Sequence, residues 1–213
     1  MHNMSSIGPA SEQDEPEPDS PSEYKPLPAA CFGIDVVCDD ARWHPHIAYI
    51  QTWLGELGVV LGLPSHGEVS VRLTDDAQIA DLNISYRDKT GPTNVLSFPA
   101  HDFVVHAGPT DDRTNDTGRF PDVPFALGDI VLAFDTLARE AAAADKPFTS
   151  HLAHLLTHGL LHLLGYDHEN DTDAARMEAK ETALLVDAGL DDPYGDTQPM
   201  PITDPDTRGP AHE

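Results

Sequence analysis

Hydrophobic residues recur along the middle of the chain with the two periods expected of strands and of helices. Residues 68–74 alternate and place Val69, Val71 and Leu73 on one side, which predicts a half-buried strand. Short apolar runs predict three more strands, at 33–38, 95–98 and 129–134. A helical period occurs at 45–62, about 75–86, 136–144, 149–164 and about 173–188.

The helix predicted at 149–164 differs from the others because apolar residues surround it almost completely. Its leucines are Leu152, Leu155, Leu156, Leu160, Leu161, Leu163 and Leu164. A helix with this pattern is normally buried. Since strands come mostly early in the chain and helices late, we predict an α+β domain in which a small mixed β-sheet packs against this central helix, with further helices around it.

Both ends of the chain lack such periodicity. Residues 1–28 are rich in proline and acid, and residues 191–213 in Asp, Pro and Thr, so neither segment can bury enough apolar surface to fold. We therefore expect two disordered acidic tails and a folded domain at 29–190. Residues 101–124 are rich in Asp, Thr, Pro and Gly without a period, which predicts a mobile surface loop.

Acids outnumber bases throughout the chain, 37 to 12, and the net charge is −25. The expected domain keeps more than half of this excess, which at first sight argues against a nucleic-acid partner. Such a surface is typical of adaptation to high salt or of solubility maintained by repulsion.

The sequence predicts a cytoplasmic protein outside the membrane. It has no apolar run of about 20 residues, and its N-terminal segment lacks the basic and apolar regions of a secretory signal. Cys31 and Cys38 lie in one apparent strand, too far apart to form a disulfide with each other.

Three histidines near the C-terminus have the spacing of metal ligands. His158 and His162 share one face of the predicted helix, Gly165 supplies the left-handed residue that ends it, and the chain then turns back to deliver His168. Three protein nitrogens leave a fourth tetrahedral position open, as in catalytic rather than structural zinc sites. We predict one Zn²⁺ per chain at these histidines.

His151 and His154 lie on the same helix and are rival ligands. Neighbouring nitrogens on tetrahedral zinc lie about 3.3 Å apart, whereas His154 and His162 are separated by about 12 Å of helix rise. One ion cannot easily hold both. We therefore predict capping or packing roles for His151 and His154.

The same spacing occurs in the metzincin signature H-E-x-x-H-x-x-G-x-x-H, so a metalloprotease-like hydrolase is an alternative reading. In zinc proteases the Glu beside the first histidine is the general base, and here that position is Gly159. The nearest other candidate for a base is Asp167. It has an alternative role in orienting a ligand histidine or capping the turn.

Two long motifs are present in a fixed order. One motif lies at 151–168 and comprises His151-Leu152-Ala153-His154, His158-Gly159, His162-Leu163 and Gly165-Tyr166-Asp167-His168. The other lies at 82–99 and comprises Leu82-Asn83, Tyr86-Arg87 and Pro92-Thr93-Asn94-Val95-Leu96-Ser97-Phe98-Pro99. The short segment Leu127-Gly128-Asp129-Ile130 lies between them. Together they resemble the bacterial YbeY family of endoribonucleases over most of residues 33–189.

The resemblance implies that the three histidines bind zinc and that the protein cleaves single-stranded RNA in 16S rRNA 3′-end maturation and ribosome quality control. It also implies contacts with small-subunit ribosomal proteins and an assembly GTPase. Arg87 would be the catalytic arginine of the cleft, because a guanidinium grips phosphate and stabilises its developing charge. Its alternative role is a salt bridge to Asp88 or another acid. A further alternative for the protein is a ribosome-assembly factor with a mainly structural metal.

Overall fold

The computed structural model of the protein describes residues 32–102 and 120–195. The predicted tail at 1–28 lies outside this range, as do Cys31, residues 103–119 of the predicted loop and residues 196–213. The predictions of disorder and mobility for those segments therefore stay predictions.

The described strands form one mixed four-stranded sheet in the order β1-β2-β4-β3. Their bounds are β1 Gly33–Cys38, β2 Gly67–Thr74, β3 Val95–Pro99 and β4 Phe125–Ala133. β2 pairs in parallel with both β1 and β4, whereas β3 runs antiparallel to β4 at the edge of the sheet. The predicted α+β class with a small mixed sheet is confirmed.

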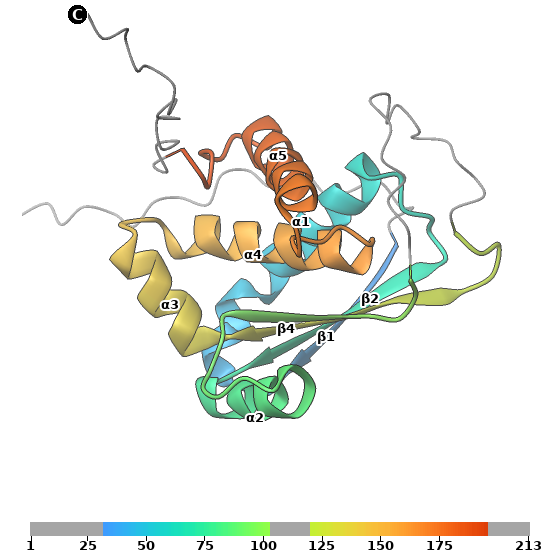
Figure 1. Ribbon diagram of the computed structural model, residues 1–213. Helices are drawn as coiled ribbons and strands as arrows, with labels where there is room; N and C mark the ends of the chain where they lie inside the picture. The colour runs from blue at the N-terminus through green and yellow to red at the C-terminus, as the bar shows by residue number, and fades with distance from the viewer. Residues whose placement is uncertain (1–31, 103–119, 196–213) are drawn as a thin grey trace, which may run out of the picture.

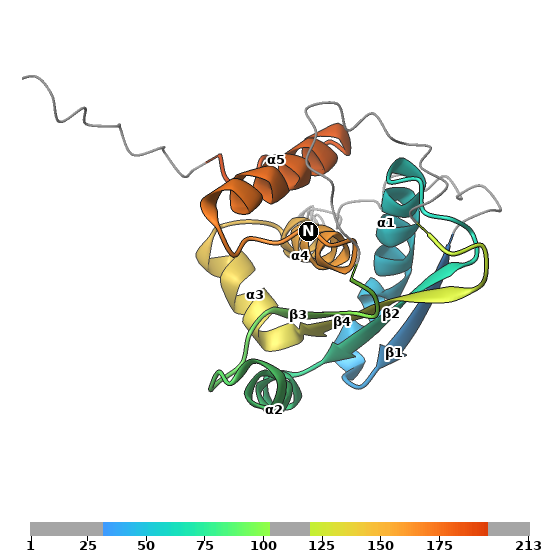
Figure 2. The same cartoon turned by 45° about the vertical axis from the view of Figure 1, so that its right-hand side comes forward.

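Helices cover both faces of this sheet. Their bounds are the 3-10 helix η1 Ala41–His46, α1 Ile47–Val60, α2 Asp76–Arg87, α3 Phe134–Ala143, α4 Phe148–Leu163 and α5 Asp171–Asp187. α2 lies on one face, α1 and α4 lie on the other, and α5 packs on the outer side of α4 (Figure 1). Figure 2 shows α3 beside the first turns of α4. No helix in the described ranges has the length and apolar character needed to cross a bilayer.

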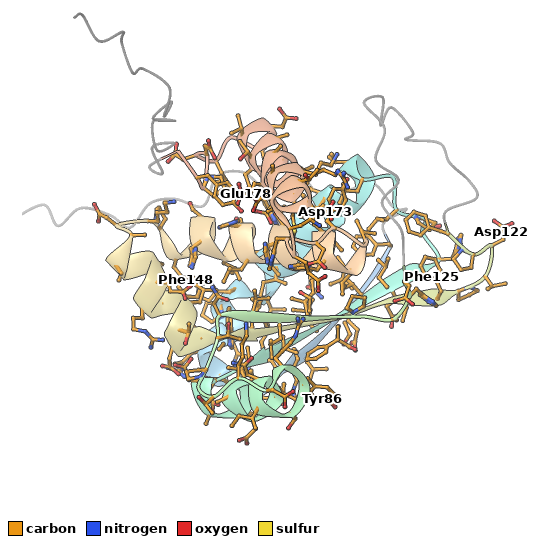
Figure 3. All side chains as sticks on the ribbon, viewed as in Figure 1. Tyr86, Asp122, Phe125, Phe148, Asp173 and Glu178 are labelled. Carbon is orange, nitrogen blue, oxygen red and sulfur yellow. The ribbon has the colours of Figure 1, made fainter. Side chains whose placement is uncertain are left out.

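Labelled side chains in Figure 3 mark the two sides of the sheet. Tyr86 of α2 lies on one side of the sheet, and Asp173 and Glu178 of α5 lie on the other (Figure 3). The histidine helix α4 lies between the sheet and α5, so packing on several sides holds the two predicted metal ligands on this helix.

α4 is the central helix of the domain, as its sequence predicts. It contacts β3, β4, α1, α3 and α5, and all of its leucines are buried. A buried hydrogen bond from Trp53 Nε1 to Thr157 Oγ1, of 3.1 Å, joins α1 to α4, and Thr157 donates in turn to the carbonyl of Ala153. This polar link fixes the rotation of α4 within an otherwise apolar interface.

The strand predicted at 129–134 has different bounds in the structure. β4 begins four residues earlier, and Phe134 belongs to α3, where its ring packs against Trp43. A β-bulge lies opposite Glu68, and Gly128 beside it has φ of 140°, a conformation that favours glycine. The bulge breaks the alternation of residues, which hides the first half of the strand from a period-based prediction.

The helix predicted to start at Pro45 is also different, because Pro45 lies inside η1 and α1 follows it. The Asp40 side chain caps η1 by accepting from the Arg42 backbone N–H at 3.0 Å. Trp43 in the same turn is fully buried, and its Nε1 donates to the Thr74 carbonyl at 2.9 Å. Burying this tryptophan determines how the chain enters α1.

The structure also describes residues 191–195, which follow the predicted end of the domain at residue 190. Thr182 Oγ1 donates to Asp192 Oδ1 at 3.0 Å, and Lys146 Nζ donates to the Pro193 carbonyl. Tyr194 donates its hydroxyl proton to the buried carboxylate of Glu181. Residues 192–194, which the sequence analysis assigned to the C-terminal tail, therefore make polar contacts with α5 and with the turn before α4.

Candidate active site and metal centre

A polar cleft of about 570 Å³ opens between the C-terminal half of α4, the edge strand β3 and the end of α2. The residues that line it include Asn83, Arg87, Lys89, Asn94, Ser97, His101, Asp102, His158, His162, Asp167, His168 and Glu169. It thus brings together the two sequence motifs, which lie far apart in the chain.

The structure brings the three predicted metal ligands together in this cleft. His158 and His162 come from successive turns of α4, and His168 comes from the segment that follows Gly165. Gly165 has φ of 88° and ends the helix as predicted. One ring nitrogen of each histidine lies within 4.8 Å of the others, and the Nε2 atoms of His158 and His162 are 3.0 Å apart.

The hydrogen bonds behind these rings favour metal binding. His158 Nδ1 is 2.6 Å from Glu181 Oε1, and His162 Nδ1 is 3.0 Å from the Tyr166 carbonyl oxygen. Both partners are acceptors, so each ring carries its proton on Nδ1 and directs the lone pair of Nε2 into the cluster. Two lone pairs at this separation repel each other unless a cation lies between them, so the donor set fits a metal ion.

Electrostatics keeps His162 in the form that binds a metal. Burial, followed by the charges of His158 and His168, lowers the pKa of His162 to about 4. The imidazole is therefore neutral near pH 7, and its lone pair is available as a ligand.

Glu181 is a functional candidate that the sequence prediction missed. It lies on α5, is fully buried, and accepts hydrogen bonds from His158, from His154 Nε2 at 3.3 Å and from Tyr194. Burial alone would raise the pKa of Glu181, but these hydrogen bonds outweigh it and bring the pKa to about 2. The signal in the sequence was a charged residue within the buried stripe of α5, because such a charge has to be paired.

Arg87 lies at the end of α2 in the same cleft as the histidines. Its Nη2 donates to the Ser97 carbonyl at 3.2 Å, and it pairs with no carboxylate among the described residues. Asp88 is the left-handed residue that ends α2, with φ of 54°. The structure therefore does not place Arg87 in the salt bridge that was its alternative role.

The rival ligands His151 and His154, and Asp167, contact other described groups. His151 Nε2 is 2.9 Å from Glu140, and His154 contacts Glu181, so neither ring belongs to the three-histidine cluster. Asp167 Oδ1 accepts from the backbone N–H of His168 at 2.7 Å, which holds the turn that delivers this ligand. The carboxylate remains exposed at the rim of the cleft.

Gly159, at the position of the protease glutamate, faces the sheet. A Cβ built there would lie 3.1 Å from Ile130 Cγ2 and 3.2 Å from Ser97 Oγ. A glutamate would therefore have to enter the packed interface between α4 and the sheet. This position serves close packing, and a general base has to come from elsewhere.

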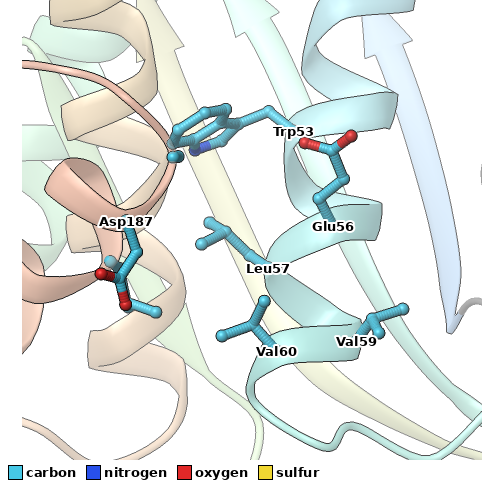
Figure 4. Close-up of a pocket in the computed structure, with 8 residues that line it drawn as sticks. Trp53, Glu56, Leu57, Val59, Val60 and Asp187 are labelled. Atoms are coloured by element: carbon cyan, nitrogen blue, oxygen red, sulfur yellow. The ribbon is translucent and has the colours of Figure 1, made fainter. Parts of the chain in front are cut away.

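A second hollow, of about 320 Å³, lies between α1 and α5 (Figure 4). It is mostly apolar and lined by residues that include Trp53, Leu57, Val60 and Leu184. None of the histidines lines it, so the hollow is separate from the metal centre.

Fold and site together define an α+β protein with a cluster of three histidines that could hold a metal ion, in a polar cleft that also contains an arginine. The family described as endoribonuclease YbeY matches residues 40–189. The chain belongs to this family.

Two relatives named endoribonuclease YbeY support the assignment along nearly the whole domain. The endoribonuclease YbeY of Ruegeria pomeroyi is 45% identical over 168 residues, which cover 76% of this chain and 97% of that protein. That of Azorhizobium caulinodans is 42% identical and covers 76% of this chain and 95% of the relative. The solution structure of TM1509 from Thermotoga maritima aligns with 71% of this chain and 85% of that chain, with a TM-score of 0.46 and 24% identity.

Proposed function

We propose that this protein is a zinc-dependent endoribonuclease that cleaves single-stranded RNA and acts in 16S rRNA 3′-end maturation and ribosome quality control. The observation that carries the proposal is one polar cleft lined by three clustered histidines and by Arg87 and Lys89. A metal-binding cluster next to cationic side chains suits a phosphodiester substrate. The names of the relatives supply RNA as the substrate class.

Zinc would be held by Nε2 of His158, Nε2 of His162 and one ring nitrogen of His168. When bound, it supplies Lewis acidity toward a phosphoryl oxygen and lowers the pKa of water. Three imidazoles also accept nickel, cobalt or copper, so these metals belong in the test.

Arg87 would bind the phosphate at the scissile bond. Its guanidinium presents a planar fork of N–H donors that matches two phosphate oxygens. The Ser97 carbonyl holds one of these donors and thereby orients the rest of the fork. As negative charge gathers on the phosphoryl oxygens, the guanidinium stabilises it without having to reorganise.

Proton transfer would fall to a carboxylate at the rim of the cleft, because Gly159 has none to offer. Asp102, Asp167 and Glu169 line the cleft. Asp167 is the first to test, because its Oδ1 is held by the His168 backbone N–H and this fixes the carboxylate beside a ligand histidine.

The acidic surface limits how RNA can bind, because most of it repels phosphate. Binding would depend on the cations of the cleft and on partners that present the RNA. Small-subunit ribosomal proteins and an assembly GTPase are the proposed partners, and their location on the ribosome makes the protein cytoplasmic.

The test is cleavage of a labelled single-stranded RNA, with the same sequence as a duplex for comparison. Zinc-loaded protein should cut only the single strand, and a chelated sample and Arg87→Glu should not cut it. Arg176→Glu is the matched control, because it makes the same charge change on α5 outside the cleft. Cleavage that survives both chelation and Arg87→Glu would come from a contaminating ribonuclease.

The two alternatives predict different results in the same series. A ribosome-assembly factor with a mainly structural metal would bind zinc and show no cleavage of any RNA. A metalloprotease-like hydrolase would cut a labelled protein substrate in a reaction that the chelator stops. The packing of Gly159 against the sheet disfavours the second alternative.

A further inference from the structure

We propose that Glu181 is a positioning residue for the ligand His158 and that Tyr194 holds Glu181 in place, so that the segment after α5 forms part of the metal centre. The inference rests on the proposed function only for the claim that the histidine cluster binds zinc. It adds two residues, on α5 and beyond it, that lie outside the two motifs.

The position of Glu181 in the fold is unusual for a carboxylate. Its neighbours in the buried stripe of α5 are apolar, namely Met177, Leu184 and Leu185. A buried charge is costly unless hydrogen bonds satisfy it, and an apolar side chain would serve packing equally well. A role in packing therefore does not explain a glutamate here.

The two carboxylate oxygens of Glu181 have different partners. Oε1 accepts from His158 Nδ1 at 2.6 Å, on the side of the metal centre. Oε2 accepts from His154 Nε2 at 3.3 Å and from the Tyr194 hydroxyl. The contacts to Oε2 fix the rotation of the carboxylate, and this directs Oε1 at the ligand histidine.

Tyr194 reaches this carboxylate because two other contacts hold its segment. Thr182 anchors Asp192, and Lys146 anchors Pro193. The Tyr194 ring also meets the His154 ring edge to face, with centroids 5.7 Å apart. α4, α5 and the segment after α5 thus converge behind one predicted metal ligand.

The expected effect of this arrangement is on metal affinity. A carboxylate that accepts from Nδ1 fixes the tautomer and orientation of the ring and makes Nε2 a stronger ligand. Loss of such a partner typically weakens metal binding by about 10–100-fold.

The experiment measures zinc affinity by competition with a colorimetric chelator, on the full chain. Glu181→Met removes the acceptor and keeps the volume, so zinc affinity should fall by about 10–100-fold. Glu181→Gln keeps one acceptor oxygen and should bind zinc with an affinity between those of Glu181→Met and the wild type. Tyr194→Phe removes only the hydroxyl and should weaken zinc binding less than Glu181→Met does.

Glu178→Met is the matched control, because it makes the same substitution at an exposed position of α5 and should bind zinc like the wild type. The metal-free form of each variant is first checked by thermal unfolding. Glu181→Met leaves the donors of His154, His158 and Tyr194 without their acceptor, so the metal-free domain should also lose some stability. Cobalt spectra report on the ligand geometry independently of activity.

Different outcomes separate the two proposals. Zinc affinities equal to the wild type in Glu181→Met and Tyr194→Phe would overturn the inference while leaving the metal site intact. A fall in metal-free stability with unchanged zinc affinity would also overturn it, because that is the result expected of a purely structural residue. A wild-type chain that binds no zinc would overturn the metal part of the proposed function together with the inference.

Discussion

Replacing Gly159 by alanine tests how tightly α4 packs on the sheet. The added methyl carbon would lie 3.1 Å from Ile130 Cγ2, 3.3 Å from Ile130 Cδ1 and 3.2 Å from Ser97 Oγ. The optimal separation of nonbonded carbon atoms is about 3.5–4.0 Å, so the neighbouring atoms must move away by a few tenths of an ångström. Ile130 has little room to do so, because it is fully buried on β4, which is paired on both sides.

Two opposing effects decide the sign of the stability change. Alanine in a helix interior is favoured over glycine by about 1 kcal/mol. Overpacking a well-packed core costs about 1–3 kcal/mol. We therefore expect Gly159→Ala to lower the free energy of unfolding by up to about 2 kcal/mol. Any shift of α4 away from β3 would also move His158 and His162, and zinc affinity should fall with it.

Urea unfolding of the metal-free protein, followed by tryptophan fluorescence, measures the change. A stabilisation of about 1 kcal/mol would mean that Ile130 and Ser97 do not crowd the added methyl group, since only helix propensity would then be acting. Ser97→Ala provides a control, because Ser97 Oγ is one of the crowding atoms and has no described hydrogen-bond partner. In the double variant the cost of Gly159→Ala should shrink by about 0.5 kcal/mol or more.

Three further predictions concern the metal, the core and the charge of the cleft. Zinc at about 100 times its dissociation constant should raise the free energy of unfolding of the wild type by about 2.7 kcal/mol, and His162→Ala should lose this gain. An equal gain in His162→Ala and in the wild type would contradict the assignment of His162 as a ligand. Leu160→Ala, at a fully buried position on α4, should cost about 2–5 kcal/mol in urea unfolding, and a cost below about 1 kcal/mol would mean that α4 is not central. Lys89→Ala should reduce the slope of log RNA affinity against log salt by about one, and an unchanged slope would remove Lys89 from the RNA contact.

The geometry of the histidine cluster could be predicted because it is local. His158, His162 and His168 lie within eleven residues, and a helix followed by one left-handed glycine determines how they converge. The buried character of α4 was equally readable, since leucines surround the helix. In both cases the backbone conformation of a short segment carries the information.

Glu181 and Tyr194 could not be assigned in the same way. The contact of Glu181 with His158 spans 23 positions and depends on how α5 crosses α4, which no local period encodes. Tyr194 lies in a segment whose composition predicts disorder, although polar contacts hold it in place. The charged residue in an apolar stripe was a signal that something had to pair with it, but the sequence did not name the partner.

The metal centre and the chemistry around it are determined at different levels of the structure. A helix and a turn suffice to assemble three nitrogens, and that arrangement is shared with the protease signature. The rest of the fold then selects the reaction. The sheet under α4 crowds Gly159, the position of the protease glutamate, and the end of α2 brings Arg87 into the cleft. A guanidinium suits a phosphate far better than a peptide carbonyl. With Arg87 beside it, the same arrangement of three histidines therefore favours a phosphodiester substrate.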